Sequence, residues 1–125
     1  MSRELSVLIP VLRRPHRIRP VAEAFRRSTP ACEVVFGVDE DDIETRREIQ
    51  KLESSIKEVV FAVVDGRRVG YASKINLLCR YAFRPLLFFG ADDLNPQPGW
   101  FSQAHWRMER YSDLQVATAT FRWLV

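Results

Sequence analysis

The chain has 125 residues, of which 46% are hydrophobic and 28% are charged, which suits one folded domain and argues against two domains or a disordered chain. Its 19 Lys and Arg against 16 Asp and Glu give a formal net charge of +3, too small to indicate a nucleic-acid protein by charge alone. The sequence shows no signal-peptide pattern, no apolar run long enough to span a membrane and only two cysteines, so we expect a cytoplasmic protein in a reducing compartment.

Apolar runs alternate with helix-like stretches along the chain, which is the pattern of a parallel β-sheet with crossover helices. Several runs are nearly continuous Val, Leu, Ile and Phe, as is typical of strands buried on both faces. The expected strands are Leu5–Val11, Glu33–Val38, Val59–Val64, Leu86–Phe89 and Leu114–Thr120. The fold class we predict is α/β, with a mostly parallel Rossmann-like sheet and flanking helices.

Helices are expected between the strands, because apolar residues repeat there at spacings of three and four. The first lies between Pro15 and Ser28 and begins late, since the proline at position 20 is tolerated only in a first turn. The second and third cover about Asp41–Lys57 and Ala72–Phe83, and the fourth has Pro98 at its first position. His105 falls in the apolar stripe of the fourth helix, so we expect a core histidine there rather than a metal ligand.

Four polar clusters follow the first four expected strands. In an open parallel sheet the carboxyl ends of the strands share one edge, and ligands bind in the crevice at that edge. The clusters are Pro10–Arg17, Asp39–Asp42, Asp65–Lys74 and Gly90–Asn95. We therefore expect them to meet at one ligand-binding edge.

Two adjacent carboxylates, Asp92 and Asp93, follow the apolar run that ends at Phe89. Mg²⁺ and Mn²⁺ prefer oxygen ligands, and Mg²⁺ is commonly held by one or two carboxylates together with substrate phosphates. The turn from Gly90 to Asp93 is thus a candidate metal site. The structural alternative is that Asp93 caps a turn or helix and Asp92 is only solvated.

The acids after the second strand have two interpretations. Asp39 is a candidate to accept a hydrogen bond from a nucleotide base or ribose. Asp41 or Asp42 is better explained as the N-cap of the second helix, where its charge also suits the helix dipole.

Basic and amide side chains near the same edge are candidate phosphate ligands. Arg13, Arg14 and Arg17 suit bidentate binding of phosphate oxygens, although a solvated helix start is the better account of any one of them taken alone. Lys74 and Asn76 fall outside the buried stripe of the third helix. They either present an ammonium and an amide to a ligand or are ordinary surface residues.

Taken in order, these segments resemble the nucleotide-binding half of a GT-A glycosyltransferase of the inverting family two. Leu5–Pro10 is similar to that family's opening strand and proline, and Val38–Asp41 resembles its aspartate-rich second strand end. Ala72–Asn76 resembles its helix start that ends in asparagine. Leu87–Asp93, followed by Pro98–Trp100, looks like the DXD segment and its trailing Pro-Gly-Trp. Similar short forms occur in bacteriophages of actinobacteria, which implies the host cytoplasm if the chain is phage-encoded.

The resemblance implies binding of a nucleotide-diphosphate sugar with Mn²⁺ or Mg²⁺ and transfer of the sugar to an unknown acceptor. Gly90 stands where the first acid of the DXD motif is expected, which leaves Asp92 as the metal carboxylate with Asp93 assisting. The implied substrate-binding residues are Pro10, Arg14, Asp39, Lys74, Asn76 and Asp92. We expect residues 1–125 to form one nucleotide-sugar-binding domain that lacks the acceptor half, so no general base is identified and the catalytic residues are unknown.

Two other functions remain open from the sequence. A nucleotidyltransferase uses a similar sheet and similar metal-phosphate chemistry, but a glycine-rich loop after the first strand would favour it and Pro10–Pro20 has no glycine. A non-catalytic nucleic-acid or partner-binding module would use the basic cluster Arg13–Arg19. The apolar end, Phe121–Val125, also suggests a homo-oligomer formed through the C-terminus.

Overall fold

The computed structural model describes residues 4–57, 59–65, 70–110 and 122–123. For residues 59–65 and 122–123 the backbone is described, but among their side chains only that of Val63 is described. In chain order the elements are β1 (Leu5–Pro10), the 3₁₀ turn η2 (Pro15–Arg17), α1 (Ile18–Ser28), β2 (Glu33–Asp39), α2 (Ile43–Glu53), β3 (Val59–Asp65), α3 (Tyr71–Cys79), β4 (Leu86–Phe89), β5 (Leu94–Asn95), α4 (Trp100–Arg110) and β6 (Arg122–Trp123).

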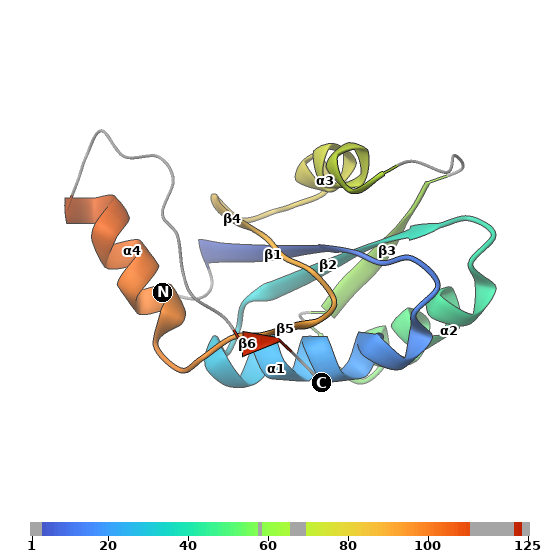
Figure 1. Ribbon diagram of the computed structural model, residues 1–125, viewed down its shortest axis with the longest axis horizontal. Helices are drawn as coiled ribbons and strands as arrows, with labels where there is room; N and C mark the ends of the chain where they lie inside the picture. Colours follow the sequence, from blue (N-terminus) through green and yellow to red (C-terminus); the bar gives the residue numbers. More distant parts are fainter. Residues whose placement is uncertain (1–3, 58, 66–69, 111–121, 124–125) are drawn as a thin grey trace.

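Four strands form one parallel sheet in the order β3-β2-β1-β4, as Figure 1 shows. The predicted α/β class is confirmed, and each of these strands lies within one residue of its expected bounds. The expected fifth strand, Leu114–Thr120, lies outside the described residues. β5 and β6 pair antiparallel in a separate small sheet that the sequence did not predict, since two-residue strands carry no periodicity.

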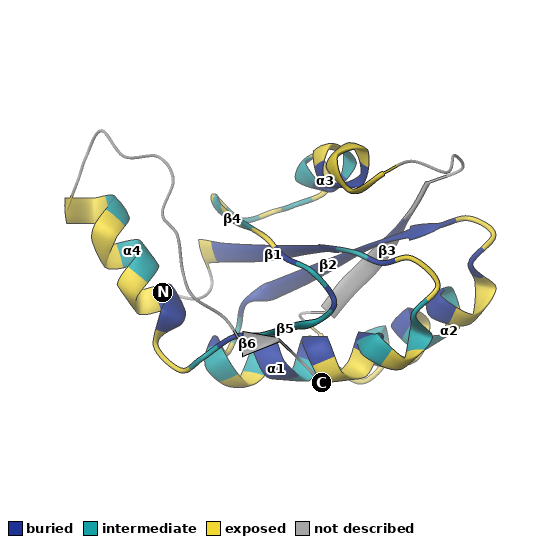
Figure 2. Cartoon of the chain, in the orientation of Figure 1, coloured by how far each residue is buried: buried dark blue, intermediate teal, exposed yellow. Residues whose placement is uncertain are grey.

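The sheet lies between α3 on one face and α1 with α2 on the other (Figure 1). Successive side chains of a strand point to opposite faces, so Val7 and Ile9 of β1 join the core under α1 and α2, whereas Leu8 joins the core under α3. Figure 2 shows β1 and β2 buried along almost their whole length. Burial on both faces explains why these strands read as continuous apolar runs.

The helix ends differ from the sequence predictions in ways that have local causes. α1 begins at Ile18 after the 3₁₀ turn, which places Pro20 in its first turn as predicted. α2 and α3 are both shorter than expected. α4 begins at Trp100 rather than at Pro98, because Gly99 between them has a φ of +84°, which no α-helix contains.

A buried carboxylate fixes the sheet at the edge opposite the expected site. Glu33, the first residue of β2, accepts a hydrogen bond from the Ser6 hydroxyl at 2.7 Å and another from the Phe83 amide at 3.2 Å. Arg84 Nε lies 4.0 Å from its second oxygen. Glu33 thus links β2 to β1 and to the segment that leads into β4.

The C-terminal prediction falls largely outside the described chain. Of Phe121–Val125, only the backbone of Arg122 and Trp123 is described, so the proposed apolar oligomer contact is not tested. Among the residues that the structure describes, no helix is long and apolar enough to cross a membrane.

Candidate functional site

Three loops leave the sheet at the same edge. In the parallel register, Pro10 of β1 pairs with Gly37 of β2, and Leu8 of β1 pairs with Phe89 of β4. The chain after β1, the acids after β2 and the turn after β4 therefore start from neighbouring points. This is the edge at which ligands of open α/β sheets bind.

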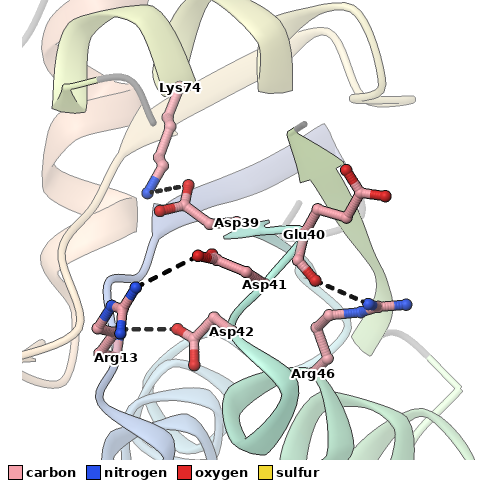
Figure 3. A network of polar contacts seen from close by, with 7 residues as sticks. All are labelled: Arg13, Asp39, Glu40, Asp41, Asp42, Arg46 and Lys74. Atoms are coloured by element: carbon pink, nitrogen blue, oxygen red, sulfur yellow. Dashed lines mark hydrogen bonds and ion pairs between the residues drawn. The ribbon is translucent and has the colours of Figure 1, made fainter. Parts of the chain in front are cut away.

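A buried ion pair joins α3 to the end of β2, as Figure 3 shows. The Lys74 ammonium lies 2.9 Å from Asp39 Oδ1, and the two side chains are only 5% and 4% exposed. Lys74 also donates to the Val11 carbonyl oxygen at 3.4 Å. The prediction that Lys74 falls outside the buried side of its helix was wrong, because a lysine paired with a buried aspartate need not face solvent.

The contact between Lys74 and Asp39 is close but is not aligned as a hydrogen bond. Asp39 Oδ1 is fully buried and has no hydrogen-bond partner among the described residues. Burying a charged acceptor costs free energy unless it is paired, and the Lys74 ammonium supplies that pairing for this oxygen.

Asp41 and Asp42 hold the loop that follows β1 (Figure 3). Asp42 accepts the backbone N–H of Arg13 at 2.7 Å, and Asp41 pairs with the Arg13 guanidinium at 3.3 Å. Asp42 does stand at the N-cap position of α2, but its side chain makes no capping hydrogen bond, so that part of the prediction was wrong. The bond to Arg13 steadies a backbone at φ 51°, a left-handed conformation that an L-residue seldom adopts.

The turn after β4 contains a second buried carboxylate with a cationic partner. Arg14 Nη1 donates to Asp92 Oδ1 at 3.1 Å, and the two side chains are 40% and 10% exposed. Burial raises the pKa of the Asp92 carboxyl, against the lowering effect of Arg14, while neighbouring Asp93 raises this pKa further. This pairing spans 78 positions of the sequence and brings together two residues that were predicted separately as ligands.

A tyrosine that the sequence reasoning missed ties α3 to the same turn. The Tyr71 hydroxyl donates to the Gly90 carbonyl oxygen at 2.7 Å, and the Gly90 amide donates to the Leu8 carbonyl oxygen at 2.8 Å. These bonds fix where the turn leaves the sheet. Only the position of Tyr71 at a helix start beside the predicted edge pointed to such a role.

The remaining candidates stand close to these pairs along the chain or in the register of the sheet. Pro10 is half-buried at the end of β1, Asp93 is half-buried beside Asp92, and Asn76 is exposed on α3. His105 is on α4, where its Nε2 lies 3.5 Å from both Glu4 and Glu109, so it is partly buried between carboxylates rather than a fully enclosed core residue.

The side chains at the carboxyl edge of the sheet determine which kind of metal ion could bind there. Within the described chain, no group of three or more His, Cys, Asp or Glu side chains is placed to hold a metal ion. Asp92 and Asp93 supply two adjacent carboxylates, which fits a Mg²⁺ or Mn²⁺ ion that takes its other oxygens from substrate phosphates and water. It does not fit an ion caged by protein alone.

The sequence comparison now places the chain in a family. The profile of the family described as glycosyl transferase family 2 matches residues 6–122. The chain belongs to glycosyl transferase family 2. Comparison of this family 2 chain with curated proteins gave no match.

The solved structures support the fold of this family 2 chain. It is similar to the mannosyltransferase PcManGT from Pyrobaculum calidifontis, determined in complex with GDP-Man and Mn²⁺, with a TM-score of 0.74 and 16% sequence identity. The match covers 84% of this chain and 32% of that chain, so the family 2 chain described here spans about a third of its neighbour. The likeness shows a shared GT-A fold.

Proposed function

We propose that this chain binds a nucleotide-diphosphate sugar at the carboxyl edge of its sheet and takes part in transfer of the sugar to an acceptor. The observation that carries the proposal is that two buried carboxylates, Asp39 and Asp92, each pair with a cation at one sheet edge of a family 2 chain. The four residues of these pairs come from four separate segments. A buried charge must be paired or ligand-bound, so such a concentration at a sheet edge indicates a binding site.

The roles of the residues follow from their placement. Asp39 and Lys74, an acceptor and a donor side by side at the end of β2, are assigned to the base or ribose. Arg14 is half-exposed and binds the diphosphate, whose oxygens suit a guanidinium. Pro10, at the end of β1, and Asn76, exposed on α3, are assigned to the same ligand.

The leaving diphosphate needs its charge stabilised as the sugar departs. Arg14 supplies one positive charge to it, next to the buried Asp92 and the half-buried Asp93. A Mn²⁺ or Mg²⁺ ion held by Asp92 with Asp93 would supply further positive charge to the same oxygens when bound. Transfer also requires a base beside the acceptor hydroxyl, and we assign no residue to that role.

The neighbour's bound ligands support this choice of substrate and metal, because its title names GDP-Man and Mn²⁺ on the same fold. Family membership favours glycosyl transfer over nucleotidyl transfer. The basic cluster gives little support to a nucleic-acid module, since Arg13, Arg14 and Arg19 each pair with a carboxylate of this chain. Both cysteines are free thiols, which agrees with the cytoplasm as the place of action.

Isothermal titration with uridine, guanosine and thymidine diphosphates in the presence of Mn²⁺ tests the proposal. We expect one of them to bind with a Kd below about 1 mM, equivalent to about −4.1 kcal/mol or better. Asp39→Asn and Asp92→Asn should weaken binding at least tenfold, whereas Glu48→Gln, which alters an exposed pair on α2, should not. The absence of binding at millimolar ligand, with both site variants indistinguishable from wild type, would refute the proposal.

A further inference from the structure

The carboxylate assigned to the metal already has a cation bound to it. Arg14 Nη1 lies 3.1 Å from Asp92 Oδ1 in the structure, and the Asp92 side chain is only 10% exposed. A nearly buried carboxylate needs a positive partner, because the loss of hydration is otherwise uncompensated. Arg14 meets this need in the free protein.

Arg14 and a divalent cation cannot both be close to this oxygen without repulsion. A Mg²⁺ ion lies about 2.0–2.1 Å from its carboxylate oxygen, within the space where the guanidinium now donates. Even if the ion used the other oxygen, two positive groups would share one small carboxylate. The charge of Arg14 therefore opposes binding of a metal ion to Asp92.

Arg14 is far more exposed than Asp92, so it can leave the pair more easily. Arg14 is 40% exposed and sits in the loop between β1 and η2, so its side chain can turn toward solvent or toward a ligand without disturbing the core. A nucleoside diphosphate brings several negative oxygens to the same edge and suits a guanidinium better than one carboxylate oxygen does. A diphosphate would therefore draw Arg14 away from Asp92.

We propose that Arg14 is an exchangeable counter-ion that occupies the metal carboxylate until a diphosphate binds, so that nucleotide and metal bind cooperatively. This inference rests on the proposed function and assigns its regulation to one residue. Either ligand alone is disfavoured. Metal alone meets the charge of Arg14, and diphosphate alone takes Arg14 from Asp92 and leaves that carboxylate without a cation.

Mn²⁺ binding measured by electron paramagnetic resonance, with and without the tightest-binding of uridine, guanosine and thymidine diphosphate, tests the exchange. In wild type the diphosphate should tighten Mn²⁺ binding, and Mn²⁺ should tighten diphosphate binding by the same factor. Arg14→Gln should bind Mn²⁺ alone on the order of tenfold more tightly than wild type, and its coupling factor should fall by a similar amount.

Two further variants separate charge from structure. Arg14→Lys keeps the positive charge and should leave Mn²⁺ binding close to that of wild type. Arg19→Gln removes the same charge from an exposed pair with Glu23 on α1 and should also leave it unchanged. Circular dichroism of each variant would check that it is folded.

The outcomes distinguish the inference from the function on which it rests. If the diphosphate binds wild type but Arg14→Gln binds Mn²⁺ no more tightly than wild type does, Arg14 does not compete with the metal and the exchange is refuted. If no diphosphate binds wild type with or without Mn²⁺, the proposed function itself fails and the exchange fails with it.

Discussion

Replacing Lys74 by methionine should destabilise the fold far more than an ordinary lysine substitution. The methionine has a similar length but no charge, so Asp39 would be buried without its cation. Removing one partner of a buried ion pair typically costs about 3–5 kcal/mol, whereas replacing both partners is often close to neutral. Asp39→Asn should be similarly costly, because it leaves the Lys74 ammonium buried alone.

The size of the effect can be expressed as a melting temperature. A chain of 125 residues has an unfolding entropy of about 0.26 kcal/mol per kelvin, from the usual value of about 2.1 cal/mol/K per residue. A loss of about 3–5 kcal/mol would therefore lower the Tm by roughly 11–19 °C. The double variant, Lys74→Met with Asp39→Asn, should recover most of this loss.

Urea unfolding followed by circular dichroism, applied to wild type, both single variants and the double variant, gives the coupling free energy between the two side chains. Lys51→Met is the matched control, since Lys51 pairs with Glu48 at 3.0 Å but is 66% exposed, and it should change stability by less than about 0.5 kcal/mol. The double variant also separates stability from binding, because it should fold but lose nucleoside diphosphate binding.

If Lys74→Met loses no more stability than Lys51→Met, the pair is not buried in solution and the assignment of Asp39 to the ligand loses its basis. If the effects of the single variants simply add in the double variant, the two side chains do not interact.

Three other substitutions test a close packing contact, a buried hydrogen bond and a buried thiol. Gly37→Ala would bring a Cβ to 3.1 Å from the nearest Leu78 methyl, so it should cost about 1–3 kcal/mol by urea unfolding, and Leu78→Val should relieve part of that cost. Glu33→Ala leaves the buried Ser6 hydroxyl without its acceptor and should cost at least about 1–3 kcal/mol, whereas Glu33→Gln should cost less. Burial raises the pKa of the Cys32 thiol, so the protonated thiol contributes stability that is present below the ordinary pKa of 9.0 and is lost as the pH rises through the raised value. When the pH is raised above 9.0, Cys32→Ala should therefore lose less stability than wild type does, as measured by urea unfolding. Equal losses would contradict this.

The sheet was predictable from the sequence because its strands are buried on both faces. Leu86–Phe89 was predicted to the residue, and the ends of the other three strands were shifted by no more than one position. The helix ends were predicted less accurately than the strand ends, because a helix end depends on single residues. Gly99 moved the start of α4 by its positive φ, which the periodicity of the sequence does not reveal.

The meeting of the polar clusters at one sheet edge was predictable, but the pairings between their side chains were not. The rule that ligands bind at the carboxyl edge placed the clusters that contain Asp39 and Asp92 together. Which cation faces which acid depends on loop paths and on contacts such as Arg14–Asp92, which joins residues 78 positions apart. The burial of Lys74 was missed for the same reason, because a helical pattern assigns lysine to the surface unless its partner is known.

The two buried carboxylates of the edge differ in the cations that neutralise them, and this difference bears on how the proposed site would bind. Lys74 comes from a helix and is as buried as Asp39, so this pair is fixed before any ligand arrives. Arg14 comes from a loop and is far more exposed than Asp92, so its pairing is open to exchange. Under the proposed function, the fixed pair would recognise the nucleoside with little reorganisation, and adjustment would be confined to the diphosphate and metal. Substitutions at Lys74 should then change which nucleoside binds, whereas substitutions at Arg14 should change how strongly metal and diphosphate depend on each other.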